Sequence, residues 1–201
     1  MIDFYFDFIS PYGYFGAVQI NALAKKHNQK VEWHSMLLGV SVMNVMGLKP
    51  LLDTPLKGDN VLKDIPHLSA LYGIPVKIPK HGFPNPVPAA RAFYFFKEHA
   101  PEQASSYALA IYHALWRDGL DISDPELLAK LMPEAGLTKN DLITALTSDE
   151  LKTLVKSKVG DSIDKGIFGA PTFVVDNEMI WGADRLWMLD HWLTHLSWSN
   201  A

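Results

Sequence analysis

Hydrophobic and polar residues alternate at the start of the chain, and the pattern then changes to a helical spacing. Phe4 and Phe6 belong to an alternation with a period of two, which predicts a β-strand over residues 2–8. Residues 11–27 follow a helical pattern, and residues 31–36 read as a second strand. A strand, a helix and a strand in this order favour a parallel pair. The helix returns the chain to the end of the sheet where the first strand began, so both strands run in the same direction.

The first helix is expected to begin at a well-marked point. Ser10 occupies the position of an N-cap and Pro11 that of the first helical residue. Phe15, Val18 and Ala22 share one face at helical spacing and are predicted to face the core. A hydroxyl at this junction lies among free backbone N–H groups at the positive end of a helix dipole. Ser10 is therefore either an ordinary cap or part of an anion site.

The middle of the chain is predicted to be mostly helical. Residues 40–90 hold many prolines and are expected to be irregular, apart from short helical pieces such as 60–72. The helices expected beyond them cover 88–99 and 102–118, and three more begin after Ser123, Thr138 and Ser148. Ser123 and Thr138 each have an acidic residue three positions later, a spacing typical of a capping box.

The end of the chain returns to an alternating pattern. Residues 172–175 and 178–181 flank Asp176 and Asn177, a pair suited to a two-residue hairpin turn. A last helix is expected after Gly182. The order β-α-β, helical block, β-β-α predicts an α/β protein with a thioredoxin-like fold and a large all-helical insertion.

Two parts of the chain are expected to pack closely, with no flexible linker between them. Residues 1–38 and 160–201 would form a discontinuous thioredoxin-like domain, and residues 39–159 the inserted helical domain.

The composition excludes several classes of function. The 201 residues include no cysteine, so disulfides, thiolate metal ligands and a thiol nucleophile of the protein itself are excluded. The formal net charge is −4 and there is no basic patch interleaved with aromatics, so nucleic acid is not expected as a partner. His191 and His195 lack supporting ligands nearby, and no metal site is predicted. Neither a signal peptide nor a membrane span is expected, and a cytoplasmic location follows by default.

Two further motifs stand at positions suited to a ligand. Gly169-Ala170-Pro171 precedes the hairpin, and in a thioredoxin-like fold a cis-proline here turns the backbone N–H and C=O of Ala170 toward a peptide-like ligand. Taken alone, the same residues are typical of a turn. Asp184 follows the hairpin at the start of the last helix, where it either caps the helix or binds an ammonium group.

Three segments together resemble one known family. They are Phe8-Ile9-Ser10-Pro11-Tyr12-Gly13-Tyr14, Phe168-Gly169-Ala170-Pro171-Thr172 and Trp181-Gly182-Ala183-Asp184-Arg185. They are similar to the motifs of 2-hydroxychromene-2-carboxylate isomerase and kappa-class glutathione transferase, two members of the DsbA-like branch of the thioredoxin superfamily. The likeness spans nearly the whole chain, including the predicted insertion.

The resemblance implies glutathione as the cofactor and a homodimer as the assembly. It implies that Ser10 is the catalytic residue, whose hydroxyl forms a hydrogen bond with the glutathione sulfur. The cofactor-binding residues that it implies are Lys57 near the glycine carboxylate, Ala170 and Pro171 at the cysteinyl part, and Ala183 and Asp184 at the γ-glutamyl end.

The resemblance also indicates residues on the substrate side. Family members often read Gly-Asn-Lys-Pro where this chain reads Gly47-Leu48-Lys49-Pro50, so Leu48 replaces an asparagine that contacts ligand. Tyr12 and Asn85 are the other residues expected near a small aromatic substrate.

Three functions follow as hypotheses. The first is a glutathione-dependent isomerase of the 2-hydroxychromene-2-carboxylate type in the catabolism of aromatic compounds. Its chemistry is covalent catalysis by a borrowed thiolate, which Ser10 and the helix N-terminus would keep ionised. The second is a kappa-type glutathione transferase or peroxidase, and the third is a DsbA-like binding module without catalysis. Glutathione binding separates the third from the other two, and the preferred electrophile separates the first from the second.

Overall fold

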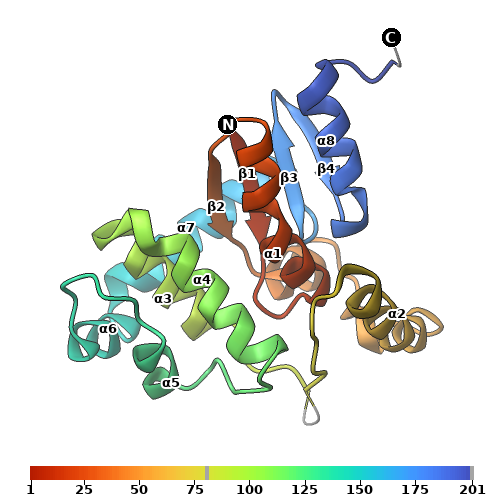
Figure 1. The fold of residues 1–201 in the computed structure, drawn as a ribbon. Coiled ribbons are helices and arrows are strands. Elements are labelled where there is room, and N and C mark those ends of the chain that lie inside the picture. Colours follow the sequence, from red (N-terminus) through yellow and green to blue (C-terminus); the bar gives the residue numbers. More distant parts are fainter. Residues whose placement is uncertain (80–81, 200–201) are drawn as a thin grey trace.

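A four-stranded mixed sheet forms the centre of the structure (Figure 1). The computed structural model describes residues 1–79 and 82–199. The strands are β1 (Ile2–Phe6), β2 (Val31–Ser35), β3 (Thr172–Val175) and β4 (Glu178–Trp181), in the order β2-β1-β3-β4. β1 pairs with β2 in parallel and with β3 in antiparallel orientation, and β3 pairs with β4 in antiparallel orientation. The chain therefore has the thioredoxin-like sheet that its sequence predicts.

Helices cover the sheet and make up most of the segment between β2 and β3 (Figure 1). The helices are α1 (Pro11–Lys26), η1 (Gly39–Val45), η2 (Leu51–Asp53), α2 (Lys57–Tyr72), α3 (Val87–His99), α4 (Pro101–Trp116), α5 (Pro125–Lys130), α6 (Lys139–Leu146), α7 (Asp149–Asp164), η3 (Ala183–Arg185) and α8 (Leu186–His195). η1 is a π-helix, and η2 and η3 are 3₁₀-helices. α1 packs against α8, whereas α7 contacts β2 and α3.

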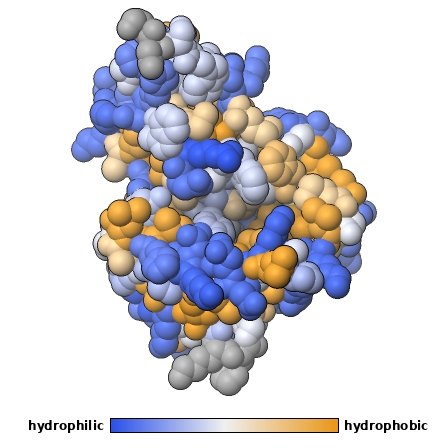
Figure 2. All heavy atoms as spheres, turned by 90° about the vertical axis from the view of Figure 1, so that its right-hand side faces the viewer, coloured by the Kyte–Doolittle hydropathy of each residue, from blue (hydrophilic) through white to orange (hydrophobic). Residues whose placement is uncertain are grey.

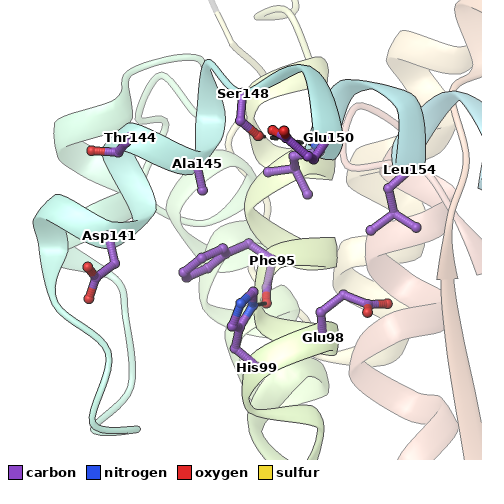
Figure 3. Close-up of a pocket in the computed structure, with 10 residues that line it drawn as sticks. Phe95, Glu98, His99, Asp141, Thr144, Ala145, Ser148, Glu150 and Leu154 are labelled. Atoms are coloured by element: carbon purple, nitrogen blue, oxygen red, sulfur yellow. Dashed lines mark hydrogen bonds between the residues drawn. The ribbon is translucent and has the colours of Figure 1, made fainter.

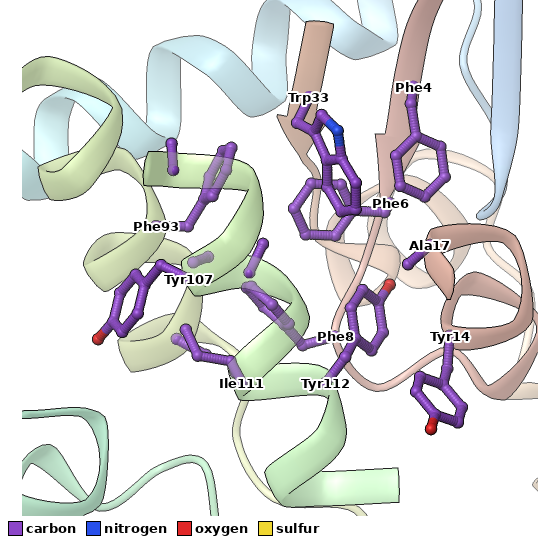
Figure 4. Close-up of a cluster of buried hydrophobic side chains, with 14 of the residues drawn as sticks. Phe4, Phe6, Phe8, Tyr14, Ala17, Trp33, Phe93, Tyr107, Ile111 and Tyr112 are labelled. Carbon is purple, nitrogen blue, oxygen red and sulfur yellow. The ribbon is translucent and has the colours of Figure 1, made fainter. Parts of the chain in front are cut away.

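One aromatic core joins the sheet to the helical part (Figure 4). The ring of Phe6 lies 5.2 Å from that of Phe93 in α3, and Phe4 meets Trp33 edge to face at 4.7 Å. Two side chains of α4 form hydrogen bonds with the segment between β1 and α1. Tyr112 Oη donates to the Asp7 carbonyl at 2.9 Å, and Trp116 Nε1 donates to the Phe8 carbonyl at 2.8 Å. The helical part therefore holds the start of α1 in place.

Several local predictions are confirmed. Ser10 is the N-cap of α1, and its Oγ accepts the Gly13 N–H at 3.0 Å. Thr138 forms a complete capping box with Asp141 at the start of α6. The turn residues Asp176 and Asn177 have φ values of 50° and 66°, as a tight hairpin between β3 and β4 requires.

Other predictions are wrong in ways that have physical reasons. β1 ends at Phe6 and not at residue 8, because the Asp7 carboxylate accepts the Ile9 N–H and starts a turn. Ala22 is exposed, whereas Ala17 and Ile20 are among the buried residues of α1. The buried face of this helix is therefore rotated about the helix axis relative to the predicted face.

Two boundaries also differ. α5 is capped by Asp124, which accepts the Glu126 N–H, and not by Ser123, which instead donates to Asp121. Residue 160, the predicted domain boundary, lies inside α7, so the division into two domains stays a prediction.

Candidate active site at the start of the first helix

Ser10 is buried at the centre of the candidate site. Its hydroxyl accepts the Gly13 N–H and donates to the Ala170 carbonyl oxygen at 2.9 Å. The side chain thus connects the N-terminus of α1 to the loop before β3, 160 residues further along the chain. Donation to a ligand sulfur requires the hydroxyl proton to turn away from that carbonyl.

The Ala170–Pro171 peptide bond is cis, as the sequence predicts. The Ala170 carbonyl is occupied by Ser10, so the expectation that both backbone groups are free is wrong for the C=O. Within residues 1–79 and 82–199, no protein group accepts a hydrogen bond from the Ala170 N–H. This N–H is the group that remains for a peptide-like ligand.

The segment that leads into α8 lies next to this loop. Gly182 N–H donates to the Pro171 carbonyl at 2.9 Å, which fixes the position of the residues that follow. Ala183 is buried, and the exposed Asp184 carboxylate lies close against Gly182. The fold therefore brings Ser10, Ala170, Pro171, Ala183 and Asp184 together, and their roles toward a cofactor stay predictions.

Tyr12 links α1 to α2 across the site. Its hydroxyl donates to Asp64 Oδ2 at 2.8 Å, and burial, followed by the negative charges of Asp64 and Asp184, raises the pKa of Tyr12. Asp64 lies two helical turns after the exposed Lys57 in α2, so the two side chains share one face of that helix. Sequence reasoning missed Asp64, although its spacing of seven residues from Lys57 is a usable signal.

Among the described residues, no hydrogen bond joins Leu48 or Asn85 to this group. Leu48 is 56% exposed, which excludes a place in the core. Asn85 Oδ1 accepts the Val87 N–H at 3.1 Å, a capping contact at the first turn of α3. Their roles toward a substrate remain predictions.

Asp7 is a second residue that sequence reasoning missed. It is fully buried, and its two carboxylate oxygens accept the N–H groups of Ile9 at 3.2 Å and Leu38 at 2.7 Å. Burial raises the pKa of Asp7 from its ordinary 3.8 to about 6, although the two backbone hydrogen bonds act in the opposite direction. Asp7 thereby ties the turn before Ser10 to the segment before η1. An acidic residue between apolar neighbours was the signal available.

A further pocket lies away from these residues. A groove of about 680 Å³ runs between α3, α6 and α7, with an apolar floor that includes Phe95 and a rim that carries Glu98 and Asp141 (Figure 3). None of its lining residues belongs to the group formed by Ser10, Ala170, Pro171, Ala183 and Asp184. The face on which α2 and α8 lie is hollowed in its middle and has hydrophobic patches beside the hollow (Figure 2).

Neither a metal-ligand cluster nor a membrane-spanning helix is present among the described residues. No three His, Cys, Asp or Glu residues gather as a metal site would need, and no helix has the length and apolarity to cross a membrane.

Comparison with known proteins places this geometry in a family. The model of the DsbA-like thioredoxin domain matches residues 1–194. The chain belongs to the DsbA-like thioredoxin family. This membership confirms the predicted fold class and fits the position of Ser10 at the strand-to-helix junction.

Named proteins are similar to the chain over all or nearly all of its length. The 2-hydroxychromene-2-carboxylate isomerase of Pseudomonas putida is 27% identical, over 100% of this chain and 98% of its own. Rat glutathione S-transferase kappa 1 is 25% identical, over 96% and 90%. A solved structure of 2-hydroxychromene-2-carboxylate isomerase superposes with a TM-score of 0.85 at 27% identity and covers 97% of this chain and 95% of its own. The predicted resemblance is therefore confirmed.

A solved structure of lower sequence identity shows a likeness of fold alone. The cytosolic disulfide reductase DsbM from Pseudomonas aeruginosa, solved with GSH, has a TM-score of 0.67 at 14% identity, over 97% of this chain and 96% of its own.

Proposed function

We propose that the protein is a glutathione-dependent isomerase of the 2-hydroxychromene-2-carboxylate type. The observation that carries the proposal is the buried Ser10 hydroxyl at the N-terminus of α1, beside the Ala170 loop, in a chain without cysteine. The similarity to isomerases of this name over the full length supports it. The proposal extends to a small aromatic substrate from the catabolism of aromatic compounds, a cytoplasmic location and a homodimer.

The residues present fit glutathione. The Ala170 N–H has no acceptor among residues 1–79 and 82–199 and can donate to a peptide group, as the cysteinyl part of a tripeptide needs. Lys57 is an exposed cation at the first residue of α2, where a ligand carboxylate also gains from the helix N-terminus. The carboxylates of Asp184 and Asp64 both act on Tyr12, so negative charge is available for an ammonium group. When bound, glutathione supplies a thiolate that adds reversibly to a conjugated double bond.

The chain's own residues position and ionise that sulfur. Ser10 would donate a hydrogen bond to the thiolate, and the N-terminus of α1 would contribute its positive end. Because a free thiol has a pKa of about 8.5, a decrease of about two pH units makes the thiolate the main form at neutral pH. The Ala170 backbone and the Asp184 segment hold the rest of the molecule.

Calorimetric titration with glutathione tests the proposal, together with a pH titration of the bound thiolate by its ultraviolet absorbance. We expect binding to the wild type and a thiol pKa below that of free glutathione. Ser10→Ala should raise that pKa and reduce turnover by about one to three orders of magnitude. Ser148→Ala, which removes the N-cap of α7, is the matched control for a lost cap. Absence of glutathione binding would refute the proposal and favour a binding module.

A kappa-type glutathione transferase is the second candidate. The similarity to rat glutathione S-transferase kappa 1 favours it, and the same residues would hold the same thiolate. Turnover of a hydroxychromene carboxylate against a chloronitroaromatic compound distinguishes the two activities.

A further inference from the structure

The groove between α3, α6 and α7 has an apolar floor (Figure 3). Its volume of about 680 Å³ lies within the range of about 300–1,000 Å³ that is usual for ligand pockets. The floor includes Phe95 of α3, Ala145 of α6, and Leu151 and Leu154 of α7. An occupant with an apolar face would remove this floor from water, which is favourable.

The rim of the groove carries negative charge from three helices. Glu98 belongs to α3, Asp141 to α6 and Glu150 to α7, and all three residues are exposed. Figure 3 shows these carboxylates on different sides of Phe95. None of the described lining residues is a lysine or an arginine. The groove therefore attracts positive charge from several sides of its floor.

The polar groups of the rim are suited to accept hydrogen bonds. Among the described residues, neither Glu98 nor Glu150 takes part in an ion pair. The Phe95 carbonyl accepts a hydrogen bond from His99 Nδ1 at 2.9 Å, so a neutral imidazole offers its Nε2 as an acceptor. His99 is exposed and also lines the groove. The rim thus matches a partner that supplies N–H donors and positive charge.

The distribution of the carboxylates favours an extended cationic partner over a small one. A single ammonium group pairs closely with one carboxylate, whereas carboxylates on three helices are paired together by an occupant with several cations. A helix about 10 Å in diameter, sunk to half its depth, fills about 40 Å² of cross-section, so a groove of about 680 Å³ has room for about three turns. An amphipathic helix that lays its apolar face into a groove is a common mode of recognition.

We propose that this groove is the docking site for a partner protein that binds through a basic amphipathic helix of about three turns. The apolar residues of that helix pack on Phe95 and Leu154, and its lysine or arginine residues pair with Glu98, Asp141 and Glu150. The groove lies apart from Ser10, so the inference does not depend on the proposed function.

Calorimetry with two designed peptides tests the chemistry of the partner. The first has the sequence LKKLLKKLLKKL, which places leucine on one face of a helix, and the second has glutamate at every lysine position. A peptide of this length is only marginally helical in water, so circular dichroism reports helix formation on binding. We expect the lysine peptide to bind, to become helical and to bind less tightly as salt is added. The glutamate peptide should bind at least about tenfold more weakly.

A double variant of the rim tests whether binding occurs in the groove. Glu98→Gln with Glu150→Gln should weaken binding of the lysine peptide about two- to thirtyfold, the effect of two exposed ion pairs. Asp141 is left unchanged because it forms the capping box of α6. Glu102→Gln with Glu126→Gln is the matched control, because both glutamates lie in the first turn of a helix, as Glu150 does, but outside the groove.

Leu154→Lys is a second, independent variant. It removes an apolar side chain from the floor and adds a charge of the same sign as the peptide, so binding should weaken at least about tenfold. Leu62→Lys, at an exposed position of α2, is its control.

The inference is overturned if the lysine peptide does not bind, if the glutamate peptide binds equally well, or if the groove variants behave like their controls. Equally tight binding of 4-phenylbutylamine, which has one cation, would also overturn it and would indicate a small ligand. A change in the sedimentation of the protein alone, caused by the groove variants and not by their controls, would overturn it in favour of a second copy of the chain.

Discussion

Replacement of Asp7 by asparagine should make the stability of the protein less dependent on pH. Asp7 is fully buried, and its pKa is raised from 3.8 to about 6. A raised pKa means that the folded state binds the proton more tightly than the unfolded state. The carboxyl therefore favours the folded state most when it is protonated, and this stability is lost as the pH rises through the interval between the two values.

The magnitude follows from the same interval. At about 1.4 kcal/mol per pH unit, the rise from 3.8 to about 6 corresponds to about 3 kcal/mol in total. About 2 kcal/mol of this stability is lost between pH 4.5 and 7.5, because the rest has already been lost between pH 3.8 and 4.5 or below. Asparagine does not ionise, but it offers one acceptor oxygen to two N–H groups, so the variant also loses a hydrogen bond worth about 1–3 kcal/mol at every pH.

Urea denaturation of both proteins between pH 4.5 and 7.5 measures the difference directly. Relative to the wild type, Asp7→Asn should gain about 2 kcal/mol in its free energy of unfolding across this range. Asp53→Asn, at an exposed carboxylate, controls for a simple change in net charge. A constant difference between Asp7→Asn and the wild type at all pH values would refute the reasoning, because it would show that Asp7 binds protons equally in both states.

Two further predictions concern α2 and the segment before it. Leu48→Asn should tighten glutathione binding about two- to tenfold by calorimetry, because it restores a hydrogen-bonding side chain at an exposed position; equal or weaker binding would show that Leu48 does not face the ligand. Gly58→Ala should lower the unfolding free energy by more than about 1 kcal/mol, because a Cβ there meets the Leu52 carbonyl. Its control Gly160→Ala, in open space within α7, should raise stability by about 0.5–1 kcal/mol, and a similar loss in both variants would contradict the steric argument.

Local chemistry explains which parts of the fold were predictable. Ser10 and Pro11 mark the start of α1 because capping and a fixed φ act within a few residues. Asp176 and Asn177 mark the hairpin because few residues accept a positive φ. The error at Ser123 has the same origin: Asp124 caps equally well, and only the contact of Ser123 with Asp121 decides between them.

Contacts between distant segments explain what was missed. The buried face of α1 depends on how the helix packs against β1 and α4. The helical spacing alone therefore assigned Ala22 to the core. Ser41 stands in an apolar stretch whose π-helical form and missing hydrogen bond are properties of the packed structure. Tyr12 was expected on the substrate side, but its bond to Asp64 depends on α2 folding back across α1.

The contact between Ser10 and Ala170 bears on what the proposed cofactor would gain from the serine. Without ligand, the hydroxyl already donates to the Ala170 carbonyl, so donation to a sulfur exchanges one hydrogen bond for another. A neutral thiol accepts a hydrogen bond weakly, and the exchange then favours the carbonyl. A thiolate is charged, and hydrogen bonds to charged groups are about twice as strong, so the exchange favours the sulfur only after it ionises. On this argument Ser10 would contribute less to the affinity for glutathione than to the acidity of its thiol, and we expect Lys57, Asp184 and the Ala170 N–H to provide most of the binding.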